Sequence, residues 1–155
     1  YQAGRLARVT ALASEDACIN DTLPLPALPG QLVDASCIFS DQLAWFMVTM
    51  QDAGRLVNRC FVITATGELL AEDSASPEDE SWLAKGIRGN FATGQSLFAA
   101  TDEGIVMVGI SGRGLEVTQT FPDTADFVDS HSRLLPGKNG INVVSSHDIT
   151  RLTIQ

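Results

Sequence analysis

A turn followed by a β-rich stretch recurs four times along this chain of 155 residues. The four copies span residues 4–12, 54–63, 112–120 and 147–154. The first three begin with Gly-Arg, and polar and apolar residues partly alternate through all of them. A supersecondary unit that returns every few dozen residues is the signature of a repeat architecture. The recurrence therefore constrains the fold strongly, although it does not identify a function.

Strand patterns dominate the sequence and fall into three groups. Aromatic and β-branched stretches bounded by Gly, Asp and Ser are typical of strands, and connections of a few residues join antiparallel neighbours. No long stretch keeps apolar residues at helical spacing, so we predict an all-β chain of antiparallel meander repeats. The predicted strands cover residues 32–39, 43–50, 56–65 and 68–71, then 96–100, 105–110 and 115–121, then 132–135, 141–144 and 149–154.

Repeated three- or four-stranded meanders with short turns resemble the blades of a β-propeller. Residues 66–70 look like the outer hairpin of a blade, and residues 100–106 look like the turn between two inner strands. The Trp-Asp mark of the WD40 family is absent, because neither Trp45 nor Trp82 precedes Asp. Residues 123–154 also resemble the last blades of propellers that accompany bacterial von Willebrand A and MoxR-type ATPase modules. The resemblance implies a propeller-like fold.

The number of repeats leaves the closure of the fold open. We treat residues 1–155 as a single all-β repeat domain. The chain begins inside a repeat and holds about three more, whereas the smallest usual propellers have about four blades. An arc that does not close exposes edge strands. The alternatives are a fragment of a larger propeller, which a first residue other than Met allows, and a β-sandwich or barrel.

The charge of the chain restricts its partners. The net charge is −9, and the ten Lys and Arg residues are scattered. Nucleic acids and anionic membrane surfaces both attract clustered basic residues, so we expect neither as a partner. The longest apolar runs, at residues 43–50 and 104–110, are too short to span a bilayer.

Three cysteines, Cys18, Cys37 and Cys60, lie at wide spacings. An odd count without short spacings does not indicate a disulfide framework, and free cysteines are among the most buried residue types. We therefore expect Cys37 and Cys60 to be buried thiols and the compartment to be a reducing cytoplasm. Alternate residues of a strand share one face, which predicts that Leu56, Cys60 and Val62 lie on a buried face.

One acidic segment is the candidate partner-binding site. It is predicted to be an exposed loop, because closely spaced carboxylates repel one another and favour solvent. As a functional site it docks a basic surface of a partner protein, and otherwise it is only a solvated loop. The aromatic residue beside it is the one most expected to be exposed. The candidate residues are Glu72, Asp73, Glu78, Asp79, Glu80 and Trp82.

The remaining polar clusters are interpreted as turns. Asp123, Asp126, Asp129 and His131 lie close together after Pro122, but their spacing matches no metal-binding motif. The Gly-rich stretches at residues 86–89 and 111–114 lack the lysine and the following helix of a phosphate loop. No nucleophile motif is present. We therefore expect no metal site, no cofactor and no identified catalytic residue.

These features favour a protein-binding or scaffolding module whose partner is another protein or the remainder of a propeller. Fold alone does not fix function, so two alternatives stay open. A propeller-type hydrolase or lyase would gather Asp, Glu, His or Arg from different blades at a central funnel. A carbohydrate-binding β-sandwich would expose an aromatic platform, for which only Tyr1, Trp45 and Trp82 are available.

Overall fold

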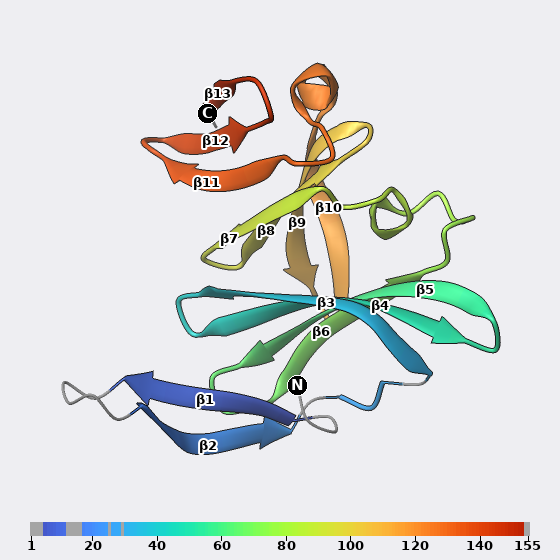
Figure 1. Cartoon of the computed structure of the whole chain (residues 1–155), viewed down its shortest axis with the longest axis vertical. Helices are drawn as coiled ribbons and strands as arrows, with labels where there is room; N and C mark the ends of the chain where they lie inside the picture. Colours follow the sequence, from blue (N-terminus) through green and yellow to red (C-terminus); the bar gives the residue numbers. More distant parts are fainter. Residues whose placement is uncertain (1–4, 12–16, 25, 29, 154–155) are drawn as a thin grey trace.

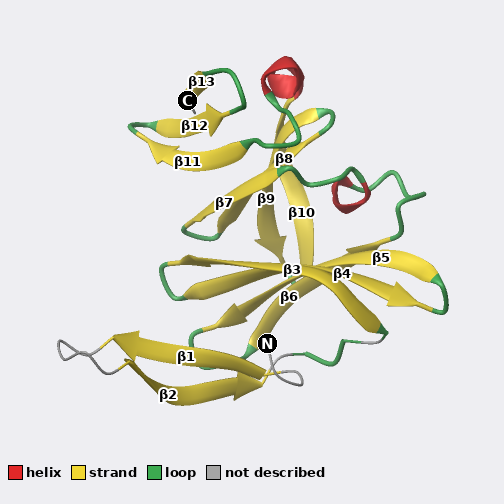
Figure 2. Cartoon of the chain, in the orientation of Figure 1, coloured by secondary structure: helices red, strands yellow, loops and turns green. Residues whose placement is uncertain are grey.

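The computed structural model describes residues 5–11, 17–24, 26–28 and 30–153, with the backbone alone for 5–11 and 17–24. The described strands form four antiparallel sheets that follow one another along the chain (Figures 1 and 2). The prediction of an all-β chain built of antiparallel meanders is confirmed. Among the described residues, the structure has no helix long and apolar enough to cross a membrane.

The sheets differ in their number of strands. The first pairs β1 (Arg5–Ala11) with β2 (Ala17–Pro24). The second and third sheets each hold four strands in chain order, and the fourth sheet holds three. The second sheet contains β3 (Gln31–Ser40), β4 (Leu43–Asp52), β5 (Arg55–Thr64) and β6 (Leu69–Ala75). The third sheet contains β7 (Gly89–Thr93), β8 (Ser96–Thr101), β9 (Gly104–Ser111) and β10 (Gly114–Phe121). The fourth sheet contains β11 (Arg133–Gly137), β12 (Gly140–Val144) and β13 (Ile149–Thr153).

Tight turns set the register of these meanders. β3 and β4 are joined by a two-residue turn that begins at Asp41, and Ser40 pairs with Leu43 across it. The next hairpin turns at Ala53 and Gly54, whose φ values of 46° and 83° fit the left-handed turns that match strand twist. Two short 3-10 helices, η1 (Trp82–Ala84) and η2 (Pro122–Phe127), connect sheets.

The second, third and fourth sheets stack in chain order (Figure 1), and apolar clusters fill the two spaces between them. Trp45 and Val62 of the second sheet pack against Leu97 and Val108 of the third, and all four are fully buried. The opposite face of the second sheet holds another cluster that includes Phe46, Phe61 and Ile63. The cluster between the third and fourth sheets contains Phe98, Ala100, Ile105, Leu134, Ile141 and Val143.

The stacked sheets are oriented alike. The first strands β3, β7 and β11 lie side by side, and so do the last strands β6 and β10. Between the second and third sheets, and again between the third and fourth, the chain passes from the last strand of one sheet to the first strand of the next. One edge of the stack is a row of first strands, and β3 is its member in the second sheet.

The structure corrects several predictions from the sequence. Cys60 and Val62 are fully buried, but Leu56 is 45% exposed because it lies beside the hairpin tip. Cys37 is exposed rather than buried, because β3 is an edge strand with little covering it. β7 was not predicted, and β6 extends through Ala75 into the expected acidic loop.

Replacement of Val62 by Asp is expected to lower the free energy of unfolding by about 3–5 kcal/mol, because it leaves an unpaired charge between two sheets. Leu56→Asp on the same strand is the matched control, and its effect should stay within about 0.5 kcal/mol because Leu56 is largely exposed. Chemical denaturation of the two variants and the parent measures both values. Equal effects at the two positions would contradict the stacking of the second sheet on the third.

The two described thiols should differ in reactivity. Burial, with a smaller contribution from the Asp73 carboxylate, raises the pKa of the Cys60 thiol, so that it stays protonated and shielded. Cys37 is exposed. Brief maleimide labelling of the folded protein, followed by peptide mapping, should modify Cys37 and leave Cys60 unmodified until the chain is unfolded. Labelling of Cys60 at the same rate as Cys37 would contradict this burial.

Candidate functional site

The predicted acidic loop divides into two parts with different environments. Glu72 and Asp73 belong to strand β6 and face opposite sides of the second sheet. Glu78, Asp79 and Glu80 lie beyond the strand, and all three side chains are exposed. The sequence placed all five in one loop because edge strands and loops carry similar charged residues.

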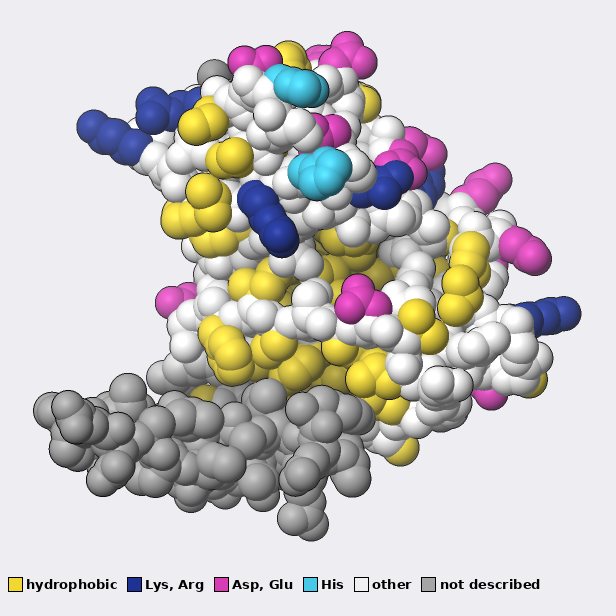
Figure 3. Space-filling view, in the orientation of Figure 1, with side chains coloured by type: hydrophobic (Ala, Val, Ile, Leu, Met, Phe, Trp, Pro, Cys, Tyr) yellow, Lys and Arg dark blue, Asp and Glu magenta, His cyan; other side chains and the backbone are white. Residues whose placement is uncertain are grey.

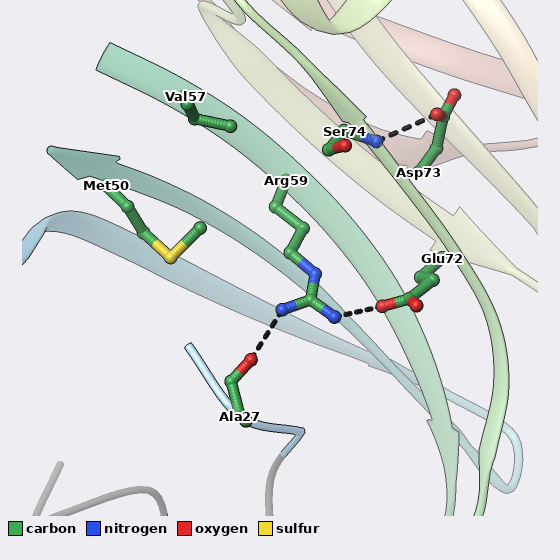
Figure 4. Close-up of a pocket in the computed structure, with 7 residues that line it drawn as sticks. All are labelled: Ala27, Met50, Val57, Arg59, Glu72, Asp73 and Ser74. Carbon is green, nitrogen blue, oxygen red and sulfur yellow. Dashed lines mark hydrogen bonds and ion pairs between the residues drawn. The ribbon is translucent and has the colours of Figure 1, made fainter. Parts of the chain in front are cut away.

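Glu72 is committed to an ion pair. Its carboxylate binds the Arg59 guanidinium, which also donates to the Ala27 carbonyl at 2.7 Å (Figure 4). The same guanidinium lies over the Phe61 ring. The Arg59 side chain is 15% exposed and that of Glu72 is 42% exposed. This pair ties β5 and β6 to the segment that precedes β3, which is a structural task rather than a docking one.

A hollow of about 500 Å³ surrounds this ion pair. Its ionisable lining residues are Arg59, Glu72 and Asp73, which come from neighbouring strands of one sheet. Asp73 accepts a hydrogen bond from the Ser74 amide at 2.8 Å (Figure 4). The acids and the base of this hollow are therefore already engaged with protein groups.

The exposed turn is held by local hydrogen bonds of its backbone and of the Asp79 side chain. The Asp79 carboxylate accepts a hydrogen bond from the Ser76 amide at 2.7 Å, and the Asp79 amide donates to the Ser76 carbonyl. The three ion pairs of the described residues involve Arg59, Lys85 and Arg88, none of them with this turn. Glu78, Asp79 and Glu80 thus form an ordered acidic turn, a name used below for these three residues.

Trp82 is buried, contrary to the sequence prediction. The Ser81 hydroxyl accepts a hydrogen bond from the Leu83 amide and starts the short helix η1. This helix turns Trp82 and Leu83 into the cluster between the second and third sheets, where Trp82 is 7% exposed. Trp45 is fully buried in the same cluster. Neither tryptophan offers an aromatic platform to a sugar, and Tyr1 lies outside the described residues.

A second hollow of about 240 Å³ opens between the second and third sheets. Asn58 organises it, accepting from the Thr49 hydroxyl at 2.9 Å and donating to the Leu83 carbonyl at 2.8 Å. Of the residues that line it, only Asp34 and Arg59 carry a charge. A site for acid–base chemistry places two or more ionisable groups within reach of a substrate. Arg59 is already paired with Glu72, so we interpret this hollow as a polar gap with structural hydrogen bonds.

The cluster around Asp129 is a hydrogen-bonded lock. Asp129 accepts from the Ser146 hydroxyl at 2.6 Å and its amide at 2.9 Å, from the His131 amide at 2.8 Å and from the Ser132 hydroxyl at 3.1 Å. These bonds, those from Ser146 foremost, hold the pKa of the Asp129 carboxyl well below its usual range. They join the segment before β11 to the turn between β12 and β13.

This arrangement does not activate a serine. A Ser–His–Asp relay needs the imidazole between the hydroxyl and the carboxylate, whereas the Ser146 hydroxyl donates directly to Asp129. The His131 Nδ1 atom lies 3.0 Å from the Ser130 hydroxyl and 3.4 Å from the Ser146 hydroxyl. His131 contacts the Asp129 carboxylate through its backbone amide rather than through its ring. In the described part of the chain, no group of three or more His, Cys, Asp or Glu residues is placed to hold a metal ion.

Comparisons with protein-family models, with curated proteins and with solved structures find no match to this chain. A function must therefore be inferred from the surfaces of the molecule itself. Of the surfaces predicted from the sequence, the ordered acidic turn remains as a candidate binding element.

Replacement of Asp129 by Asn should lower the melting temperature at pH 7, because the carboxylate accepts four hydrogen bonds. A carboxyl whose folded pKa is depressed stabilises the protein above its unfolded pKa, and this stability is lost as the pH falls. The difference between parent and Asn variant should therefore narrow below about pH 4. Thermal melts at pH 7 and pH 3 measure this, and a difference that is constant with pH would refute the lock.

Proposed function

We propose that this chain is a protein-binding or scaffolding module built of propeller-like repeats. The observation that carries the proposal is the ordered acidic turn, where Glu78, Asp79 and Glu80 are exposed and take no part in the ion pairs of the described residues. A turn held by local hydrogen bonds presents its charges at a lower entropy cost of ordering on binding than an unstructured loop does. Its partner is a protein with a basic surface.

Other features support a binding role over the alternatives. The charged groups of the larger hollow come from one sheet and are engaged, so no group from different sheets converges there as a funnel enzyme requires. Both tryptophans are buried, so two of the three residues expected to form an aromatic platform for a sugar do not offer one. The free thiols of Cys37 and Cys60 suit a reducing cytoplasm, which the proposal includes.

The test compares two variants with the same change of net charge. Glu78→Gln/Asp79→Asn/Glu80→Gln neutralises the ordered acidic turn, and Asp52→Asn/Glu68→Gln/Glu116→Gln neutralises three exposed carboxylates elsewhere. The probe is a fluorescent lysine-rich peptide, whose binding is followed by anisotropy. We expect the turn variant to bind about tenfold more weakly, the control to bind like the parent, and added salt to weaken binding to the parent.

Equal weakening by the two variants would show that the peptide senses only net charge, and the proposal would fail. Both variants should retain the stability of the parent within about 0.5 kcal/mol, because the substituted side chains are exposed. A larger loss in the turn variant would show that the turn is a structural element.

A further inference from the structure

Among the described residues, the second and third sheets hold apolar clusters on both faces, whereas the fourth sheet holds one on a single face. Leu134, Ile141 and Val143 belong to the cluster shared with the third sheet, and Leu152 packs against it. Alternate residues of a strand point to opposite faces, and paired residues of neighbouring strands share a face. The register of β11, β12 and β13 therefore defines an opposite face, called the outer face below, made of Arg133, Leu135, Asn142, Val144, Ile149 and Arg151.

The outer face is open to solvent. Ile149 is 74% exposed, which is the largest value for a large apolar side chain among the described residues, and Leu135 is 49% exposed. Arg133 and Arg151 are exposed as well. Figure 3 shows Lys and Arg side chains beside hydrophobic ones at the end of the molecule that the fourth sheet occupies in Figure 1. Apolar side chains gathered on one face and rimmed by polar groups mark an interaction surface.

The charge of the fourth sheet is opposite in sign to that of the whole chain. Its three strands contain Arg133 and Arg151 and no Asp or Glu. Lys138 is exposed in the turn between β11 and β12, and Asp148 lies in the turn before β13. The ion pairs of the described residues involve other basic side chains. A chain with 19 acidic and 10 basic residues thus presents a locally basic face whose charges are free to pair with a partner.

The two arginines stand at diagonal corners of the outer face. Arg133, Val144 and Ile149 form one row across the three strands, and Arg151 lies in the next row beside Asn142. Two strand spacings and one step of two residues separate the Cα atoms of the arginines by about 12 Å. Positions i and i+7 of an α-helix share one side and lie about 10.5 Å apart. The arginine diagonal therefore matches two turns of a helix laid across the sheet, and helices commonly cover one face of an antiparallel sheet.

We infer that the outer face of the fourth sheet binds an acidic amphipathic helix of a partner protein. Carboxylates at positions i and i+7 of that helix pair with Arg133 and Arg151, whose planar guanidinium groups suit bidentate carboxylate binding. Aliphatic side chains at positions i+3 and i+4 lie over Val144, with Leu135 and Ile149 on either side. This surface is separate from the ordered acidic turn and has the opposite charge, so the chain can join two partners that differ in charge.

The charge around the contact favours this partner over other anions. The Debye length at physiological salt is about 8 Å, so the charges beside the outer face decide the sign of the interaction rather than the net charge of −9. Nucleic acids and anionic membranes are bound through many basic groups, whereas this sheet offers two arginines and one lysine. Apolar side chains stand between the two arginines, where a phosphate backbone has nothing to place against them.

The test uses a fluorescent helical peptide with Glu at positions i and i+7 and Leu at positions i+3 and i+4. Its comparison is a peptide of the same composition in scrambled order, and anisotropy at about 0.15 M salt measures the binding of both to the full chain. We expect the patterned peptide to bind at least about tenfold more tightly than the scrambled one. Equal binding of the two peptides would show that the face senses only charge, and the inference would fail.

Two pairs of variants locate the binding surface. Arg133→Gln/Arg151→Gln should weaken binding of the patterned peptide about tenfold, and Arg55→Gln/Arg113→Gln is its matched control, with the same change of charge at exposed arginines of other sheets. Ile149→Gln should also weaken binding without any change of charge, and Leu56→Gln is its control at another exposed apolar residue. All four variants should melt like the parent, because the substituted side chains are exposed.

Other occupants of the outer face give different results. A parent that forms dimers in sedimentation without peptide, and loses them on Ile149→Gln, would assign the face to a second copy and overturn the inference. An anionic oligonucleotide or anionic vesicles that displace the peptide from the parent, but do not bind Arg133→Gln/Arg151→Gln, would assign it to phosphate groups instead. Binding of the lysine-rich peptide at the ordered acidic turn should be the same in all four variants, so each surface is tested independently.

Discussion

The apolar layer between the second and third sheets is the contact on which the rest of the structure depends. Trp45, Val62, Leu97 and Val108 are completely buried in it, and η1 adds Leu83. An antiparallel sheet commonly packs on one face and meets water on the other. Here both four-stranded sheets also hold apolar clusters on their opposite faces. Each central strand therefore needs apolar residues at consecutive positions, as in Trp45 and Phe46.

Burial on both faces decides where polar chemistry can lie. A buried charge without a partner is costly, so ionisable groups are confined to strand edges, turns and the ends of the stack. Arg59 and Glu72 meet at such an edge, and the bonds of Asp129 join two connecting segments. The ordered acidic turn is exposed at such a position, beyond the end of β6. The faces of the two four-stranded sheets are occupied by packing, so partner binding on these two sheets is expected at strand edges and turns.

Local patterns predicted much of the fold. Strands β4, β5, β9 and β12 were found because apolar residues run between clear turn residues such as Asp41 and Gly54. β7 was missed because its sequence, Gly89 to Thr93, is short and follows a Gly-rich stretch. The strand character of Glu72 and Asp73 was missed because it depends on pairing with β5 rather than on their own propensity.

The candidate site was less accessible from sequence, because its contacts join residues far apart in the chain. Arg59 meets Ala27 across 32 positions, and Asp129 meets Ser146 across 17. Trp82 was expected in solvent because acidic residues precede it, yet a serine cap turns it into the core. The exposure of Cys37 follows from the place of β3 at an edge, which composition does not reveal. The acidic turn depends on residues that are neighbours in the sequence, so its exposure at Glu78 to Glu80 was predicted correctly.

The order of packing has a consequence for how such a chain can change over generations. Each apolar cluster draws its residues from one sheet or from two that are consecutive along the chain. Stability in arrays of this kind is close to a sum of unit and nearest-neighbour contributions. A substitution in one cluster is therefore expected to act mainly on the one or two sheets that line it, with little need for compensating substitutions in distant cores.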